Sequence, residues 1–84
     1  MPQHTLSVLL TDSPGALARL TGLLERRRVA VDSLAYGATE HPGVRRVTVA
    51  VSAERRRLEH ITRHLDNLVD VLETDRLTRE PAGS

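Results

Sequence analysis

The feature that most constrains the fold is a change in the spacing of apolar residues near the start of the chain. Residues 4–10 alternate between two faces, and one face is formed by Leu6, Val8 and Leu10. This period of two predicts a β-strand covered on one side. From residue 14 to about residue 28 the apolar positions recur every three or four residues, which predicts an amphipathic helix. The chain therefore begins with a strand that turns directly into a helix.

The turn between these two elements is the first candidate ligand site. Asp12 or Ser13 can cap the helix with a side-chain oxygen, and Pro14 suits the first helical position because its missing N–H needs no partner there. Gly15 allows a ligand to approach the backbone. A helix N-terminus carries free N–H groups and partial positive charge, so it can hold a carboxylate or a phosphate. The alternative is a well-capped strand-to-helix connection without a ligand.

The rest of the chain repeats the strand and helix patterns. Residues 29–39 and 44–52 have the features of two strands, and the turn Glu40-His41-Pro42-Gly43 between them predicts a hairpin. Ser52 stands where a helix cap is expected, and a second helical period follows at Leu58, Ile61, Leu65 and Leu68. Residues 68–75 predict a last strand, and residues 79–84 a frayed, flexible C-terminal tail.

The order strand, helix, strand, strand, helix, strand predicts an α+β fold. Two right-handed βαβ crossovers that share one four-stranded antiparallel sheet give the ferredoxin-like sandwich, with both helices on one face. We expect one domain over residues 1–78. Simple alternation assigns several apolar residues to the uncovered face of the sheet, so we expect a second protein surface to cover part of it. These residues are Leu9 and Ala50, with either Ala30, Leu34, Tyr36 and Ala38 or the residues that alternate with them.

Composition excludes several classes of function. A chain of 84 residues buries only about 60–65% of its unfolded surface, and without cysteine it lacks disulfides and thiolate metal sites, so we expect support from oligomerisation. The net charge of +1 gives no drive towards nucleic acid or membrane. A single Tyr, with no Phe or Trp, argues against RNA binding by base stacking. No apolar run approaches ~20 residues and the start lacks signal-peptide features, so we expect a cytoplasmic protein.

The remaining polar clusters predict no catalytic centre. His60 and His64 are one helical turn apart, but the sequence places no third metal ligand beside them, and we interpret them as part of a solvated helix face. The basic triplets at residues 26–28 and 55–57 can be an anion-binding patch or solvated faces; nearby Glu25, Glu54 and Glu59 favour the second interpretation. No nucleophile, base and acid are set at a useful spacing, so we expect no enzyme active site.

Several segments, in order, resemble a known family. The turn Asp12-Ser13-Pro14-Gly15-Ala16-Leu17 is similar to the ligand loop of ACT domains, which are small amino-acid-sensing modules of this topology. Residues 4–80 more closely resemble the N-terminal domain of the small subunit of acetolactate synthase, also called acetohydroxyacid synthase. The segments that carry this resemblance are Asp32-Ser33-Leu34, Thr39-Glu40-His41-Pro42, Arg46-Val47-Thr48-Val49, Leu68-Val69-Asp70-Val71 and Leu77-Thr78.

The resemblance implies a non-catalytic regulatory subunit of branched-chain amino acid biosynthesis. Such a subunit raises the activity of the large catalytic subunit and can mediate feedback inhibition by valine or another branched-chain amino acid. It implies no cofactor in this chain, whereas the catalytic partner carries thiamine diphosphate, Mg and FAD. Two other functions stay open: a free-standing ACT sensor of a different target, and an interaction module without a ligand.

The resemblance also implies a homodimer and a shared effector site. In the family two ACT domains pair side by side, and valine lies between the first loop of one chain and the second strand of the other. By position, Asp12 would bind the effector's ammonium group, and the N–H groups of Gly15 and Ala16 would hold its carboxylate. The full implied set is Asp12, Ser13, Pro14, Gly15, Ala16 and Leu17, with Ala30 and Val31 from the paired chain. The family usually has Asn at positions 12 and 30; Asp keeps the ammonium contact, but the side chain of Ala cannot form a hydrogen bond with a ligand.

Overall fold

A computed structural model describes residues 2–77, so the tail expected at residues 79–84 lies outside the described part. It has the order of elements that the sequence predicts. The six elements are β1 (Gln3–Thr11), α1 (Ala16–Arg26), β2 (Ala30–Ala38), β3 (Val44–Ser52), α2 (Arg55–Asp66) and β4 (Val71–Arg76).

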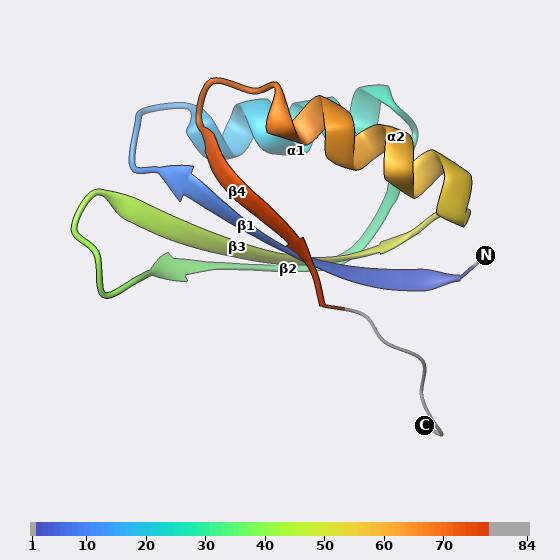
Figure 1. The fold of residues 1–84 in the computed structure, drawn as a ribbon, viewed down its shortest axis with the longest axis horizontal. Helices are drawn as coiled ribbons and strands as arrows, with labels where there is room; N and C mark the ends of the chain where they lie inside the picture. The colour runs from blue at the N-terminus through green and yellow to red at the C-terminus, as the bar shows by residue number, and fades with distance from the viewer. Residues whose placement is uncertain (1, 78–84) are drawn as a thin grey trace.

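The four strands form one antiparallel sheet in the order β2-β3-β1-β4. Both helices cover the same face of this sheet, as Figure 1 shows. The predicted ferredoxin-like α+β sandwich is therefore confirmed. Strands β2 and β4 form the two edges of the described sheet.

The core lies between the sheet and the two helices. Directly opposed residues of antiparallel strands point to the same face, so Leu6 and Val8 of β1 share the helix-covered face with Val49 and Val47 of β3. Leucines at helical spacing pack against them from α1, and Leu58, Ile61 and Leu65 do so from α2. The core contains the apolar residues whose spacing predicted the strands and helices, apart from Leu17 and Leu68. These two leucines are partly buried at the border of the core.

Helix α1 begins two residues later than expected, and its predicted cap is wrong. Gly15 occupies the N-cap position in a left-handed conformation with φ 82°, and no side chain caps the helix. Asp12 and Ser13 lie too early in the loop to cap it: the Ser13 hydroxyl instead lies 2.9 Å from the hydroxyl oxygen of Thr11. At the other end the helix stops where Arg28 adopts φ 61°.

The second helix is also shorter than its apolar pattern suggests. Glu54, not Ser52, is its N-cap residue, because the Ser52 hydroxyl donates a hydrogen bond of 2.6 Å to the Asp32 carboxylate. Leu68 follows the helix in a turn, where its N–H donates to the carbonyl oxygen of Leu65. Leu68 still packs against the core from this position.

A β-bulge in β2 overturns part of the predicted division between the two sheet faces. The register with β3 shifts between Val31 and Ser33, which leaves Asp32 without a partner residue. After the shift Leu34 lies opposite Val49 and Tyr36 opposite Val47, both of which are buried under the helices. Leu34, Tyr36 and Ala38 therefore belong to the helix-covered face, and the alternating residues Ser33, Ala35 and Gly37 lie on the open one.

The open face of the sheet is consequently more polar than expected. Residues that point away from the helices include Thr48, Arg46 and Ser7, together with the small residues Ala50 and Ala35. Leu9 lies on this face as predicted, opposite Arg46. Within residues 2–77 no helix has the length and apolarity needed to cross a lipid bilayer.

Candidate functional site

The loop between β1 and α1 presents free backbone donors at the start of the helix. Asp12 N–H donates to the Gly43 carbonyl at 2.9 Å, which joins the loop to the β2–β3 turn. Ala16 N–H donates to the Ser13 carbonyl at 3.1 Å, so this predicted carboxylate donor is already engaged. Among residues 2–77, the N–H groups of Ser13, Gly15, Leu17 and Ala18 have no such acceptor. Those of Gly15, Leu17 and Ala18 are the donors that an anionic ligand would find at this helix end.

An ion pair from outside the loop fixes its shape. Arg19 Nε donates to Asp70 Oδ2 at 2.6 Å, and another nitrogen of the same guanidinium donates to the Pro14 carbonyl at 3.2 Å. The side chain of Asp70 is only 8% exposed, whereas that of Arg19 is 49% exposed. Thr11 holds the same aspartate: its N–H donates to the Asp70 carbonyl, and its hydroxyl lies 3.4 Å from Oδ1. The loop is therefore held from both α1 and the segment before β4.

This arrangement shifts the pKa values of both charged partners. The hydrogen bond from Arg19 holds the pKa of the Asp70 carboxyl below its ordinary value, against the opposing effect of burial. The same hydrogen bond raises the pKa of Arg19. Both groups are therefore charged at neutral pH.

Asp12 is paired within the chain as well. Its Oδ1 lies 3.5 Å from Arg45 Nε, and both side chains are partly exposed. The Arg45 guanidinium also lies over the Tyr36 ring, 5.6 Å from the ring centre. An ammonium group bound at Asp12 would therefore share the carboxylate with Arg45. The contacts also connect the loop to the last part of β2.

Within one chain, the two halves of the predicted effector site lie at opposite ends of the sheet. Thr11 pairs with Val44 at one end of β3, whereas Ala30 pairs with Ser52 at the other end. Eight residue steps along β3 correspond to about 26 Å. The structure therefore brings residues 12–17 together in one loop, but it does not bring Ala30 or Val31 to that loop.

Ala30 and Val31 also point to different faces. Val31 lies opposite Val51, which is fully buried under the helices, and Ala30 lies opposite Ser52 on the other face. Val31 thus shares the side of the sheet from which the β1–α1 loop rises to the helix layer (Figure 1).

Strand β2 is exposed along almost its whole length. Eight of its nine residues are exposed, and Gly37 is half-buried. Val31, Leu34 and Tyr36 remain 40, 38 and 41% exposed although they lie on the helix-covered face. No described strand pairs with the outer side of β2. This edge combines unpaired backbone groups with exposed apolar side chains, a combination that favours pairing with another chain.

Reasoning from sequence missed four residues that shape the loop: Thr11, Arg19, Arg45 and Asp70. One signal was available, because Asp70 interrupts the apolar segment Leu68-Val69-Asp70-Val71-Leu72 and is buried there. A carboxylate at such a position needs a partner. The sequence does not indicate that the partner is Arg19, which lies 51 positions away. Within residues 2–77 no group of three or more metal-ligating side chains lies together.

The fold and the loop define an ACT-type domain. The ACT domain of GTP pyrophosphokinase from Chlorobium tepidum superposes with a TM-score of 0.75, over 89% of this chain and 96% of that one. At 14% identity this likeness concerns the fold alone. The acetolactate synthase small subunit from Thermotoga maritima superposes with a TM-score of 0.89 and 26% identity, over 98% of this chain and 51% of that one.

Sequence comparison identifies the particular family. Residues 6–73 match the AHAS small subunit-like ACT domain, where AHAS is acetohydroxyacid synthase. The acetolactate synthase small subunit of Mycobacterium leprae (strain TN) is 49% identical over 72 residues, which cover 86% of this chain and 43% of that protein. A probable acetolactate synthase small subunit of Methanothermobacter thermautotrophicus is 37% identical over 81 residues, 96% of this chain and 47% of that protein. The chain belongs to the AHAS small subunit-like ACT domain family. It spans less than half the length of these two relatives.

Proposed function

We propose that this chain is a non-catalytic regulatory subunit of acetolactate synthase that activates the large catalytic subunit. The observation that carries the proposal is the family match over residues 6–73. The large subunit would hold thiamine diphosphate, Mg and FAD and would perform the reaction in the cytoplasm. This chain would contribute binding surfaces and an effector site.

The effector would be valine or another branched-chain amino acid. Gly15 N–H and Leu17 N–H are free to hold its carboxylate at the N-terminus of α1. Asp12, which is half exposed, would bind the ammonium group beside Arg45. Val31 of a second chain would contact the branched side chain of the effector. Of Ala30 and Val31, only Val31 lies on the helix-covered side of the sheet.

The active form would be a homodimer in which two β2 edges pair in antiparallel orientation. Such pairing extends the sheet across the dimer and covers Val31, Leu34 and Tyr36, which are all partly exposed. A twofold axis at this edge brings the Ala30 end of one strand beside the Ala38 end of the other. The Ala38 end of β2 lies at the same end of the sheet as the β1–α1 loop. The loop of each chain would therefore lie near Ala30 and Val31 of the other chain, and the dimer would contain two composite sites.

Reconstitution of acetolactate formation tests the proposal. The large subunit from the same genome is assayed alone and with increasing amounts of this chain, and complex formation is followed by size-exclusion chromatography. We expect co-elution and a several-fold rise in rate, with valine lowering the stimulated rate. No co-elution and an unchanged rate would contradict the proposal. Binding of valine without any effect on the large subunit would favour a free-standing sensor instead.

A further inference from the structure

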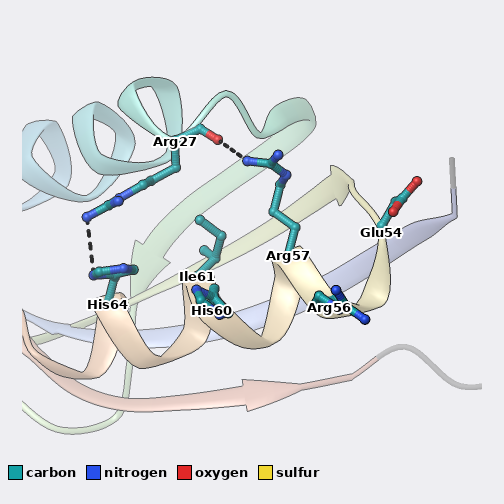
Figure 2. A pocket seen from close by; sticks show the side chains of 7 residues that line it. All are labelled: Arg27, Glu54, Arg56, Arg57, His60, Ile61 and His64. Atoms are coloured by element: carbon teal, nitrogen blue, oxygen red, sulfur yellow. Dashed lines mark hydrogen bonds between the residues drawn. The ribbon is translucent and has the colours of Figure 1, made fainter.

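A groove of about 290 Å³ between the end of α1 and the face of α2 gathers basic side chains from both helices. Its walls are Arg27, Arg56, Arg57, His60 and His64, with Ile61 among them and Glu54 as the one acidic residue. Figure 2 shows Arg27 reaching across to α2, where its guanidinium lies 3.4 Å from His64 Nδ1. Arg57 reaches back and donates to the Arg27 carbonyl at 3.2 Å. The fold thus joins two arginine triplets that are separate in the sequence.

No carboxylate within residues 2–77 forms an ion pair with these arginines. The ion pairs of residues 2–77 are Arg19 with Asp70, His41 with Glu40, and Arg45 with Asp12. All three lie away from the groove, and the acidic residues expected to dilute the triplets pair with none of their arginines. Because these arginines have no ion-pair partner within residues 2–77 and Glu54 is the one acidic residue of the lining, the groove has a positive electrostatic potential.

The stability of α2 does not account for the arginines in its first turn either, although Arg57 donates a hydrogen bond to the Arg27 carbonyl. Arg55, Arg56 and Arg57 fill the first turn, which contains no acidic residue and no side-chain cap. The helix dipole favours acidic residues at this end and disfavours cations by a few tenths of a kcal/mol or more each. Positions that break a local rule of this kind are expected where a surface serves binding.

We propose that this cationic groove docks an acidic segment of the catalytic large subunit. The inference rests on the proposed function, and it names the surface and the chemistry of that contact. The groove extends along α2 from Glu54 to His64, ten residue steps or about 15 Å. That length matches about four or five residues of extended chain, with carboxylates at intervals facing Arg27, Arg56 and Arg57. Arginine forks bind carboxylates in this way at protein interfaces.

Charge reversal at the first turn of α2 tests the proposal without weakening the helix. In the double variant Arg56→Glu/Arg57→Glu, glutamates stand where the helix dipole favours them, which offsets the loss of the hydrogen bond from Arg57 to the Arg27 carbonyl. We expect the variant to stay folded, which urea unfolding checks. We expect its apparent affinity for the large subunit, measured from activation of acetolactate formation at 50 mM salt, to fall at least tenfold. The original affinity should fall steeply as salt is raised to 300 mM, because exposed charges are screened.

The control is Arg26→Glu/Arg63→Glu, which changes the net charge equally at residues outside the lining of the groove, one on each helix. Both residues lie in last helical turns, where the helix dipole disfavours glutamate, so urea unfolding first verifies that this variant is folded. We expect its affinity to stay within twofold of the original. Equal losses in the two double variants would mean that general charge attraction suffices, and would overturn the proposal. An unchanged affinity in Arg56→Glu/Arg57→Glu would also overturn it while leaving the regulatory function intact.

A labelled hexaglutamate peptide and inorganic tripolyphosphate keep the two proposals separate. If the chain does not activate the large subunit, the proposed function fails, and with it the acidic segment of that subunit as the occupant. Groove-dependent binding of hexaglutamate, lost in Arg56→Glu/Arg57→Glu, supports the preference for an acidic peptide. Binding of tripolyphosphate in the groove at a concentration where hexaglutamate fails to bind would overturn it in favour of a small phosphorylated ligand.

Discussion

The β1–α1 loop and the edge strand β2 are the two halves of the proposed effector site, and they differ in how far one chain completes them. The loop is held by Arg19, Arg45 and Asp70 from three other parts of the fold. Strand β2 pairs on one side only, and its apolar residues on the helix side stay about 40% exposed. A single chain therefore fixes the shape of the loop but leaves the strand without a partner.

This difference indicates what each half contributes. The loop has free N–H groups and a carboxylate that can bind the charged groups of an amino acid. Its contacts with Arg19, Arg45 and Asp70 hold these groups in position before a ligand binds. The strand can add an apolar wall only where a second chain lies against it. Dimerisation and effector binding would then be coupled, because each stabilises the same edge.

The largest effect is expected from Gly15→Asp, which should abolish valine binding measured by calorimetry. The added carboxylate stands where the ligand carboxylate is expected and repels it. Gly15 has φ 82°, so the variant also loses about 1 kcal/mol of stability.

Gly43→Asp is the matched control for this variant. Its φ of 83° imposes the same backbone cost and its added charge is the same, but no atom lies within 4 Å of the new Cβ. At Gly15 the new Cβ would lie 2.9 Å from Arg19 Nη1. Retention of valine binding by Gly15→Asp would place the ligand elsewhere.

The second effect concerns the strand. Leu34→Glu places a charge in the expected dimer contact, and we expect the dissociation constant of the dimer to rise about 30-fold or more, measured by sedimentation equilibrium. Leu72→Glu on the opposite edge strand is the control, since Leu72 is also exposed, at 54%. If Leu72→Glu dissociates the dimer and Leu34→Glu does not, β4 and not β2 is the pairing edge.

A third effect separates the two residues at the start of β2. Val31→Ser removes an apolar contact worth about 1.5 kcal/mol, so valine affinity should fall roughly tenfold. Ala30→Ser introduces the same side chain on the other face and should change the affinity less than twofold. Calorimetry on the dimeric proteins measures both, and a larger loss in Ala30→Ser would reverse the assignment of faces.

The smallest effect is a pH dependence of stability centred on Asp70. The folded pKa of this carboxyl lies below its ordinary value of 3.8. Its ion pair therefore contributes fully above that value and loses its contribution as the pH falls through the lower, folded pKa. Asp70→Asn should be less stable than the original chain at pH 7, and the difference should shrink below pH 3.8. Urea unfolding at pH 7 and at pH 2–4 measures it, with exposed Asp75→Asn as control; a difference that stays constant down to pH 2 would contradict the role of the pair.

Local patterns predicted the elements of this fold but not the contacts that join them. The alternation in β1 and β3 and the helical spacing in α1 and α2 were sufficient, because each follows from burial on one face. Alternation failed at Asp32, where the side chain accepts hydrogen bonds from Gln3 and Ser52 and the strand bulges. The caps failed for a related reason, since Ser13 and Ser52 form hydrogen bonds with other side chains. Pairs distant in sequence, such as Arg19 with Asp70, depend on the packed structure.

The central claim is that the loop and the strand of one effector site belong to different chains. Mixed dimers test it most directly, with the affinity for valine measured by calorimetry. A dimer of a Gly15→Asp chain with a Val31→Ser chain should bind one valine with the original affinity, because one of its sites combines an intact loop with an intact strand. A dimer of the original chain with the Gly15→Asp/Val31→Ser double variant should have no site of the original affinity, because its intact loop lies against the substituted strand and should bind roughly tenfold more weakly. The original affinity in the second dimer and only the weaker binding in the first would show that each site lies within a single chain and would contradict the account.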